Sequence, residues 1–83
     1  MEITRLRPTN QKEFRAVRNI VHAAINLYQE QYDSMALSNV IDEKFNIHID
    51  WHDVSTALDN LSTHKLIERK GTNSAGLALY STL

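Results

Sequence analysis

The chain has 83 residues, of which 42% are hydrophobic and three are glycine or proline, so the composition predicts one globular, largely helical domain. It contains no cysteine, which excludes disulfides, thiol catalysis and cysteine-ligated zinc. The net charge of −1 points to no particular partner, but the charges are unevenly distributed along the chain.

The two ends of the chain are basic and its middle is acidic. Residues 1–18 carry five basic and two acidic side chains, and residues 65–83 carry three basic and one acidic. Residues 19–64 carry one basic and seven acidic side chains. The basic ends favour a nucleic-acid partner, whereas an acidic surface beside duplex DNA has the wrong sign and favours a protein partner.

Residues 1–9 are predicted to form an N-terminal basic arm. Ile3 and Leu6 alternate with Arg5 and Arg7 before Pro8 interrupts the pattern. Such an arm either frays or pairs as a short strand against the body, or it reaches into a nucleic-acid groove. Its charges argue against a secretory signal, and no stretch is long enough to span a membrane, so we expect a cytoplasmic location without membrane contact.

A long first helix is predicted over residues 11–31, because Asn10 and Glu13 resemble a capping box at its start. At about 100° per residue, its apolar side chains cover roughly 200° of the helix, more than burial on one side requires. We therefore expect a second contact for this helix, with a homodimer as one candidate. The candidate dimer face consists of Ala16, Ile20, Ala23 and Leu27.

A short second helix is predicted over residues 39–45, with Ser38 as its N-cap. Residues 35–37 before it are expected to be extended. Residues 46–49 are expected to form a turn into the third helix, with His48 pointing outwards.

The third helix is predicted to begin at Asp50 or Trp51 and to end at Thr63. Asp50 can accept the free N–H groups of the first turn, and apolar residues recur behind it every three or four positions. Its other side is polar, but no lysine or arginine occurs from Asp50 to His64. This surface carries His52, Ser55, Thr56, Asp59, Asn60 and Thr63.

A hairpin is predicted after the third helix, with strands at residues 66–70 and 77–82 and a glycine-bounded loop at residues 71–76. Arg69 and Lys70 stand at the end of its first strand.

No group of residues predicts catalysis. His48, Asp50 and His52 are spaced like metal ligands on a strand, but Asp50 is expected to cap a helix, so the three side chains would diverge. Gly71 and Gly76 lack the Lys-Ser/Thr pair of a phosphate-binding loop. We therefore expect no enzyme, no metal and no cofactor.

Val54, Leu58 and Leu61 in the third helix, residues 66–69 of the hairpin and Tyr80 after the loop carry a resemblance to winged helix-turn-helix domains. The resemblance implies a fold that is mainly α with a small β-hairpin (α+β), with three helices plus a C-terminal two-stranded wing in one domain over residues 10–83. That family commonly has glycine where this chain has Lys65. A non-glycine residue in the left-handed conformation costs about 1 kcal/mol there.

The resemblance implies duplex DNA binding by a small transcriptional regulator. The base-reading residues would be His52, Ser55, Thr56, Asp59, Asn60 and Thr63, of which Asn60 suits adenine best. The residues on the DNA backbone would be Arg69, Lys70, Lys65, Arg5, Arg7, Arg15 and Arg18. Winged helices also serve as protein-interaction modules, and the acidic middle segment favours this alternative, an adaptor or inhibitor that does not bind DNA.

Overall fold

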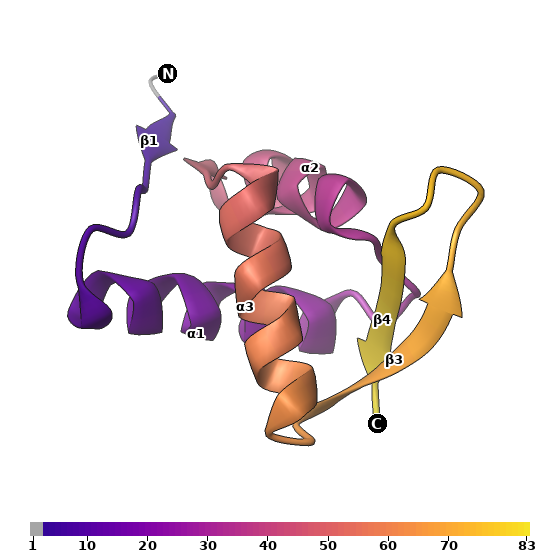
Figure 1. Cartoon of the computed structure of the whole chain (residues 1–83). Helices are drawn as coiled ribbons and strands as arrows, with labels where there is room; N and C mark the ends of the chain where they lie inside the picture. Colours follow the sequence, from indigo (N-terminus) through magenta and orange to yellow (C-terminus); the bar gives the residue numbers. More distant parts are fainter. Residues whose placement is uncertain (1–2) are drawn as a thin grey trace.

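The computed structural model describes residues 3–83, which form three helices and four strands (Figure 1). Helix α3 crosses α1, α2 lies beside both, and the β3–β4 hairpin follows at the C-terminal end of α3. The predicted fold class, mainly α with a C-terminal two-stranded hairpin, is confirmed. The elements are β1 (Thr4–Arg5), α1 (Gln11–Leu27), α2 (Ser34–Phe45), β2 (Ile47–His48), α3 (Trp51–Thr63), β3 (Ile67–Thr72) and β4 (Ala78–Thr82).

Helix α1 begins as predicted but ends four residues earlier. Asn10 Oδ1 accepts a hydrogen bond of 2.9 Å from the Glu13 N–H, and Glu13 Oε2 in turn accepts one of 3.0 Å from the Thr9 N–H. The helix ends at Leu27 because the segment after it runs to Tyr32, which pairs with the hairpin. The N–H of Tyr32 donates to the carbonyl of Tyr80 at 2.9 Å, and the N–H of Tyr80 donates to the carbonyl of Tyr32 at 2.8 Å.

Helix α2 begins five residues before the predicted start. Asp33 is its N-cap, because Asp33 Oδ1 accepts a 2.7 Å hydrogen bond from the Ala36 N–H. Residues 35–37 are therefore helical, and the prediction that they are extended was wrong. Ser38, the predicted cap, is buried inside the helix, where its hydroxyl donates to the carbonyl of Ile49 at 2.7 Å.

Asp33 also connects α2 to the tip of the hairpin. Its second carboxylate oxygen accepts a 2.7 Å hydrogen bond from Asn73 Nδ2. Asn73 Oδ1 accepts from the N–H groups of Ala75 and Leu77, each at 3.0 Å, which closes the loop between β3 and β4. One carboxylate thus stabilises a helix start and fixes the loop of the hairpin.

We expect Asp33→Ala to lower the free energy of unfolding by about 2 kcal/mol, since it removes both an N-cap and a charge-assisted hydrogen bond. Asp33→Asn is the matched control, because its amide oxygen can still cap α2, and it should lose less than half as much. Urea unfolding followed by circular dichroism measures both. A loss below about 0.5 kcal/mol for the alanine variant would contradict this role.

The segment predicted as a turn before α3 contains strand β2. It pairs in parallel with β1, with Thr4 opposite Ile47 and Arg5 opposite His48. Asn46 makes the reversal possible, because it adopts a left-handed conformation (φ 56°) that asparagine tolerates. Residues 4 and 5 of the predicted arm therefore form a short strand against the body, while residues 1 and 2 lie outside the described part of the chain.

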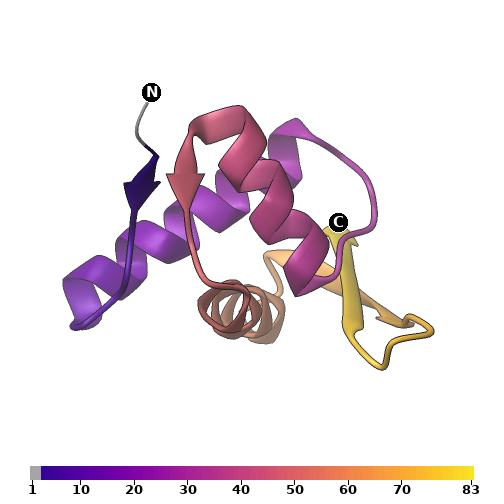
Figure 2. The same ribbon diagram turned by 90° about the horizontal axis from the view of Figure 1, so that it is seen from above.

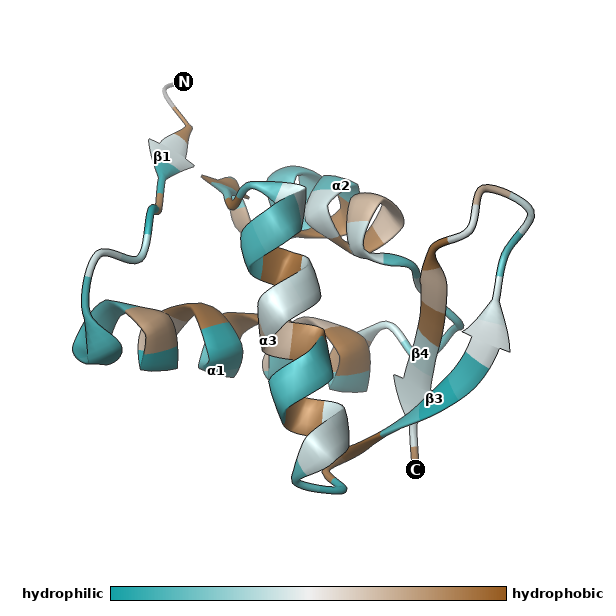
Figure 3. Cartoon of the chain, viewed as in Figure 1, coloured by the Kyte–Doolittle hydropathy of each residue, from teal (hydrophilic) through white to brown (hydrophobic). Residues whose placement is uncertain are grey.

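All three helices contribute to one core. Leu37 and Ile41 of α2, Leu58 of α3 and Ile25 of α1 are fully buried. In the hairpin, β3 is exposed after Ile67, whereas β4 is buried or half-buried throughout. Figure 3 shows hydrophobic residues along much of β4. The complete buried apolar set is Val17, Val21, Ala24, Ile25, Tyr32, Leu37, Ile41, Ile49, Val54, Ala57, Leu58, Leu61, Ile67 and Tyr80.

The strands of the hairpin differ from their predicted bounds. β3 runs on through Gly71, because a bulge between Arg69 and Gly71 is accommodated by the positive φ of this glycine, 124°. The connecting loop consequently begins at Asn73. β4 begins at Ala78, one residue later than predicted.

Lys65, two residues after the end of α3, adopts the left-handed conformation, with φ of 61°. Its N–H donates to the carbonyl of Ser62 at 2.9 Å, and the N–H of Leu66 donates to that of Leu61 at 3.0 Å. These two hydrogen bonds form a Schellman motif, in which glycine is the usual residue at the position of Lys65.

Lys65→Gly is therefore expected to raise the free energy of unfolding by about 1 kcal/mol and the melting temperature by about 4–8 °C. Thermal unfolding monitored by circular dichroism measures the change. Lys65→Ala keeps the Cβ and should give no such gain. An equal gain in both variants would contradict backbone strain as the cause.

Candidate nucleic-acid interface

Helix α3 turns Val54, Leu58 and Leu61 to the core and the opposite side to solvent. Four of the six predicted base-reading residues lie on the exposed side: His52, Thr56, Asp59 and Thr63. The other two, Ser55 and Asn60, are half-buried at the edges of this side.

The two exposed threonines on α3 already use their hydroxyl protons. Thr56 Oγ1 donates to the carbonyl of His52 at 3.0 Å, and Thr63 Oγ1 donates to that of Asp59 at 2.9 Å. Their oxygens therefore face solvent as acceptors. With the Asp59 carboxylate between them, the centre of the exposed side is rich in acceptors and contains no cation.

The side chain of Arg18, on α1, contacts α3. Arg18 Nη1 donates to Asn60 Oδ1 at 3.1 Å, so two residues for which different DNA contacts were predicted are bonded to each other. Both side chains are half-buried. The guanidinium of Arg18 thus lies at the edge of the exposed side of α3, which has no lysine or arginine of its own.

The N-terminal half of α1 lies on one side of α3 and the β3–β4 hairpin on the other (Figure 1). Seen from above, α2 and the C-terminal end of α1 lie behind these three elements (Figure 2). The first helix, α3 and the hairpin therefore border one face of the molecule, as DNA binding by these residues would require.

The arginines are available for ligands. Among residues 3–83, no arginine lies within 4.0 Å of a carboxylate oxygen; the three ion pairs are His48–Asp42, His52–Asp50 and Lys70–Glu68. Arg18 is half-buried, and the other four arginines are exposed: Arg5, Arg7, Arg15 and Arg69. Lys65 is also exposed, whereas Lys70 is paired with Glu68 at 3.1 Å.

Arg69 lies opposite Tyr80 in the hairpin. Burial raises the pKa of the Tyr80 hydroxyl, the negative charge of Asp59 raises it further, and the positive charge of Arg69 opposes both. Asp59 of α3 and Arg69 of β3 therefore both act on the same tyrosine, at the junction between α3 and the hairpin.

The N-terminus of α3 is capped by Asp50, whose Oδ1 accepts from the His52 N–H at 2.9 Å and lies 3.0 Å from His52 Nδ1. The backbone hydrogen bond and then the side-chain hydrogen bond from His52 lower the pKa of this carboxyl. The rings of Trp51 and His52 stack with centroids 3.7 Å apart.

His48, by contrast, pairs with Asp42 of α2, with Nδ1 and Oδ1 3.2 Å apart. His48, Asp50 and His52 thus form no common site, and no cluster of metal-ligating residues occurs within residues 3–83.

No family model matches the sequence, and a search of curated proteins finds no match. Among solved structures, the chain is similar to one described as giving insights into the DNA recognition and protein interaction domains of HOP2. The TM-score is 0.65 at 15% sequence identity, and the match covers 81% of this chain and 98% of that chain.

The fold is a winged-helix fold. At this identity the similarity concerns the fold alone. In the winged-helix arrangement, α2 and α3 are the helix-turn-helix pair and β3–β4 is the wing. Tyr32, just before α2, forms a bridge to Tyr80 of the wing.

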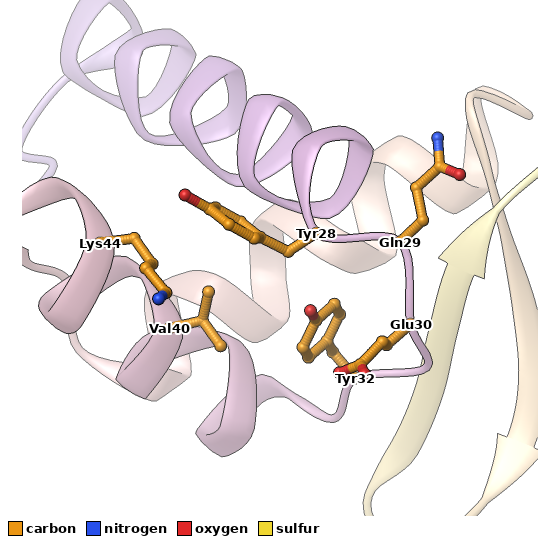
Figure 4. A pocket seen from close by; sticks show the side chains of 6 residues that line it. All are labelled: Tyr28, Gln29, Glu30, Tyr32, Val40 and Lys44. Atoms are coloured by element: carbon orange, nitrogen blue, oxygen red, sulfur yellow. The ribbon is translucent and has the colours of Figure 1, made fainter.

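A second surface lies between the end of α1 and α2, with α3 behind it (Figure 4). It encloses a pocket of about 400 Å³, and the ammonium of Lys44 lies 5.7 Å from the centroid of the Tyr28 ring. Burial and then the charge and hydrogen bond of Glu30 raise the pKa of Tyr32 in this pocket. Its lining residues are Tyr28, Gln29, Glu30, Tyr32, Val40 and Lys44.

The predicted dimer face of the winged helix is largely open to solvent. Ala16, Ala23 and Leu27 are exposed, Leu27 by 67%, whereas Ile20 is half-buried against the core. A homodimer through this face stays a prediction. Within residues 3–83, no helix has both the length and the apolar character needed to cross a bilayer.

Two contacts in this region were not predicted from the sequence, the Arg18–Asn60 hydrogen bond and the Asp33–Asn73 hydrogen bond to the wing. Each joins residues about 40 positions apart. The identity of Asn73 was a partial signal, because asparagine in a loop between strands often bonds nearby backbone groups.

Proposed function

We propose that this winged helix binds duplex DNA, as a small transcriptional regulator that places α3 in the major groove. The observation that carries the proposal is the contact between Arg18 and Asn60, because it supplies the cation that α3 lacks. Acceptors in the centre of the exposed side would meet base edges, while the arginines at its borders would meet phosphates.

Electrostatics supports this division of roles. Phosphate contacts provide most of the affinity of DNA-binding proteins, and a cation already neutralised by a carboxylate releases no counterions. Arg15 of α1 and Arg69 of the wing have no such partner among residues 3–83, although the chain as a whole carries net charge −1. The HOP2 structure, whose description includes DNA recognition, adds a precedent for the fold.

Specific base contacts would come from the four exposed residues of α3. Asp59 can accept a hydrogen bond from the N4 amino group of cytosine, and His52 Nε2 can accept one from an amino group of a base while Nδ1–H donates to Asp50. Lys65, Arg5 and Arg7 would add backbone contacts at the two ends of the interface.

Selection of bound duplexes from a random library tests this function. The wild type should enrich a short motif, and Asp59→Ala should relax the preference at one base pair of that motif while leaving the protein folded. Absence of enrichment, with binding that depends only on salt, would contradict a sequence-reading role for α3.

A protein-interaction module is the second candidate, and the exposed stripe of α1 favours it. Ala16, Ala23 and Leu27 leave exposed apolar side chains along α1, on which a second copy could pack its own α1. Light scattering after size exclusion should show a dimer that Leu27→Glu dissociates. A monomer at all concentrations would exclude this homodimer.

A further inference from the structure

A cavity of about 260 Å³ opens between the N-terminal half of α1 and the C-terminal half of α3. It lies where the basic part of α1 meets the exposed side of α3. Its lining residues are Gln11, Phe14, Arg15, Arg18 and Asn60. The set includes two guanidinium groups and two amides but no carboxylate, and neither arginine is within 4.0 Å of one among residues 3–83.

The contact between Arg18 and Asn60 determines what the cavity offers to a ligand. An arginine N–H can only donate, so Asn60 must accept with Oδ1. This orientation leaves the Asn60 Nδ2 group, with two N–H donors, for a ligand. Arg18 then occupies one of the two acceptor positions of Asn60 Oδ1, while the contact of Asn60 with adenine stays a prediction.

We propose that the cavity binds one phosphate group of the nucleic-acid backbone. Arg15, Arg18 and Asn60 Nδ2 would donate to the phosphate oxygens, and the ring of Phe14 would pack against the attached sugar. Donors that converge without a carboxylate among them match a ligand that only accepts, and charge-assisted bonds of this kind are the strong ones. The identity of the ligand rests on the proposed function, whereas the phosphate chemistry of the cavity does not.

The size of the cavity supports a sugar–phosphate unit. A single bridging water needs only about 10–15 Å³ of such space, so the cavity has room for a larger ligand. A phosphate bound there would also lie beside α3 and fix the register of this helix on the duplex, without conveying sequence information itself.

Asn60→Asp is the most direct test. The aspartate still accepts from Arg18, so the contact between α1 and α3 is kept, but the two donors are replaced by a negative charge. We expect duplex affinity to fall at least about tenfold, and equally for two duplexes of unrelated sequence. Asn19→Asp is the matched control, because it adds the same charge at an exposed position of α1 outside the cavity, and it should cost less than about threefold.

Equal losses from Asn60→Asp and Asn19→Asp would overturn the site, and so would a changed order of preference among duplexes. Circular dichroism on both variants confirms that they remain folded.

A second experiment tests phosphate binding in the cavity independently of DNA binding. In ¹H–¹⁵N spectra of the wild type, inorganic phosphate should shift the Asn60 side-chain amide saturably, and Arg15→Gln with Arg18→Gln should abolish the shift. If phosphate shifts this amide but duplex DNA does not bind, the cavity is a free-phosphate site and the DNA proposal is wrong. If neither ligand shifts it, the cavity binds no phosphate.

Discussion

Replacing Leu58 by alanine is expected to lower the free energy of unfolding by about 3 kcal/mol. Leu58 is fully buried on the core side of α3, where α3 packs against α1 and α2. Its truncation removes apolar contacts and leaves a cavity that neighbouring side chains fill only in part. In a domain of this size the melting temperature should fall by about 12–24 °C, which thermal unfolding followed by circular dichroism measures.

Leu27→Ala is the matched control for this prediction. The substitution is chemically identical, but the Leu27 side chain is 67% exposed at the end of α1, so the change should remain within about 0.5 kcal/mol. Similar losses for both variants would contradict the packing of α3. A clear loss at Leu27 that depends on protein concentration would instead support the homodimer through α1.

The second large expected effect is a loss of affinity for duplex DNA. Arg15→Glu combined with Arg69→Glu is expected to lower duplex affinity at least about 100-fold at low salt, since each change removes a phosphate contact and adds repulsion. The two residues lie on different sides of α3, one on α1 and one on the wing, so the double variant affects both borders of the proposed interface. Fluorescence anisotropy of a labelled duplex measures the loss.

Lys44→Glu is the control for charge reversal. Lys44 lies over the Tyr28 ring in the pocket between the end of α1 and α2, and it is not among the residues that line the cavity beside Arg15 and Arg18. Its reversal should change duplex affinity by less than about threefold, through long-range repulsion alone. If this reversal costs as much as Arg15→Glu by itself, the protein binds DNA through overall charge rather than through the face that contains α3.

Local signals in the sequence predicted α3 and the hairpin well. Asp50 is a strong cap, and the spacing of Val54, Leu58 and Leu61 repeats the period of one helix face, so both the start and the buried side of α3 could be inferred. The left-handed conformation at Lys65 could be expected only from the resemblance, because winged-helix domains commonly have glycine at this position.

The start of α2 and the end of α1 could not be inferred in this way. Asp33 and Ser38 are both acceptable N-caps, and what decides between them is the pairing of Tyr32 with Tyr80. This pairing links residues that are far apart in the sequence. The parallel pairing of β1 with β2 is non-local too, and nothing near Ile47 or His48 indicates it.

For the candidate interface, helical periodicity predicted which side chains of α3 face solvent, but not what their atoms do. The bond between Arg18 and Asn60 depends on how α1 crosses α3, and so does the cavity beside it. The DNA contacts of these residues stay predictions.

The salt dependence of duplex binding tests the central proposal most directly. Wild-type protein should bind a mixed-sequence duplex with micromolar affinity at low salt, and log K should fall with log [salt] with a slope of about −3 to −4, as expected for about four phosphate contacts. No binding at the lowest salt, or binding whose strength is independent of salt, would contradict the proposal that the arginines around α3 bind DNA.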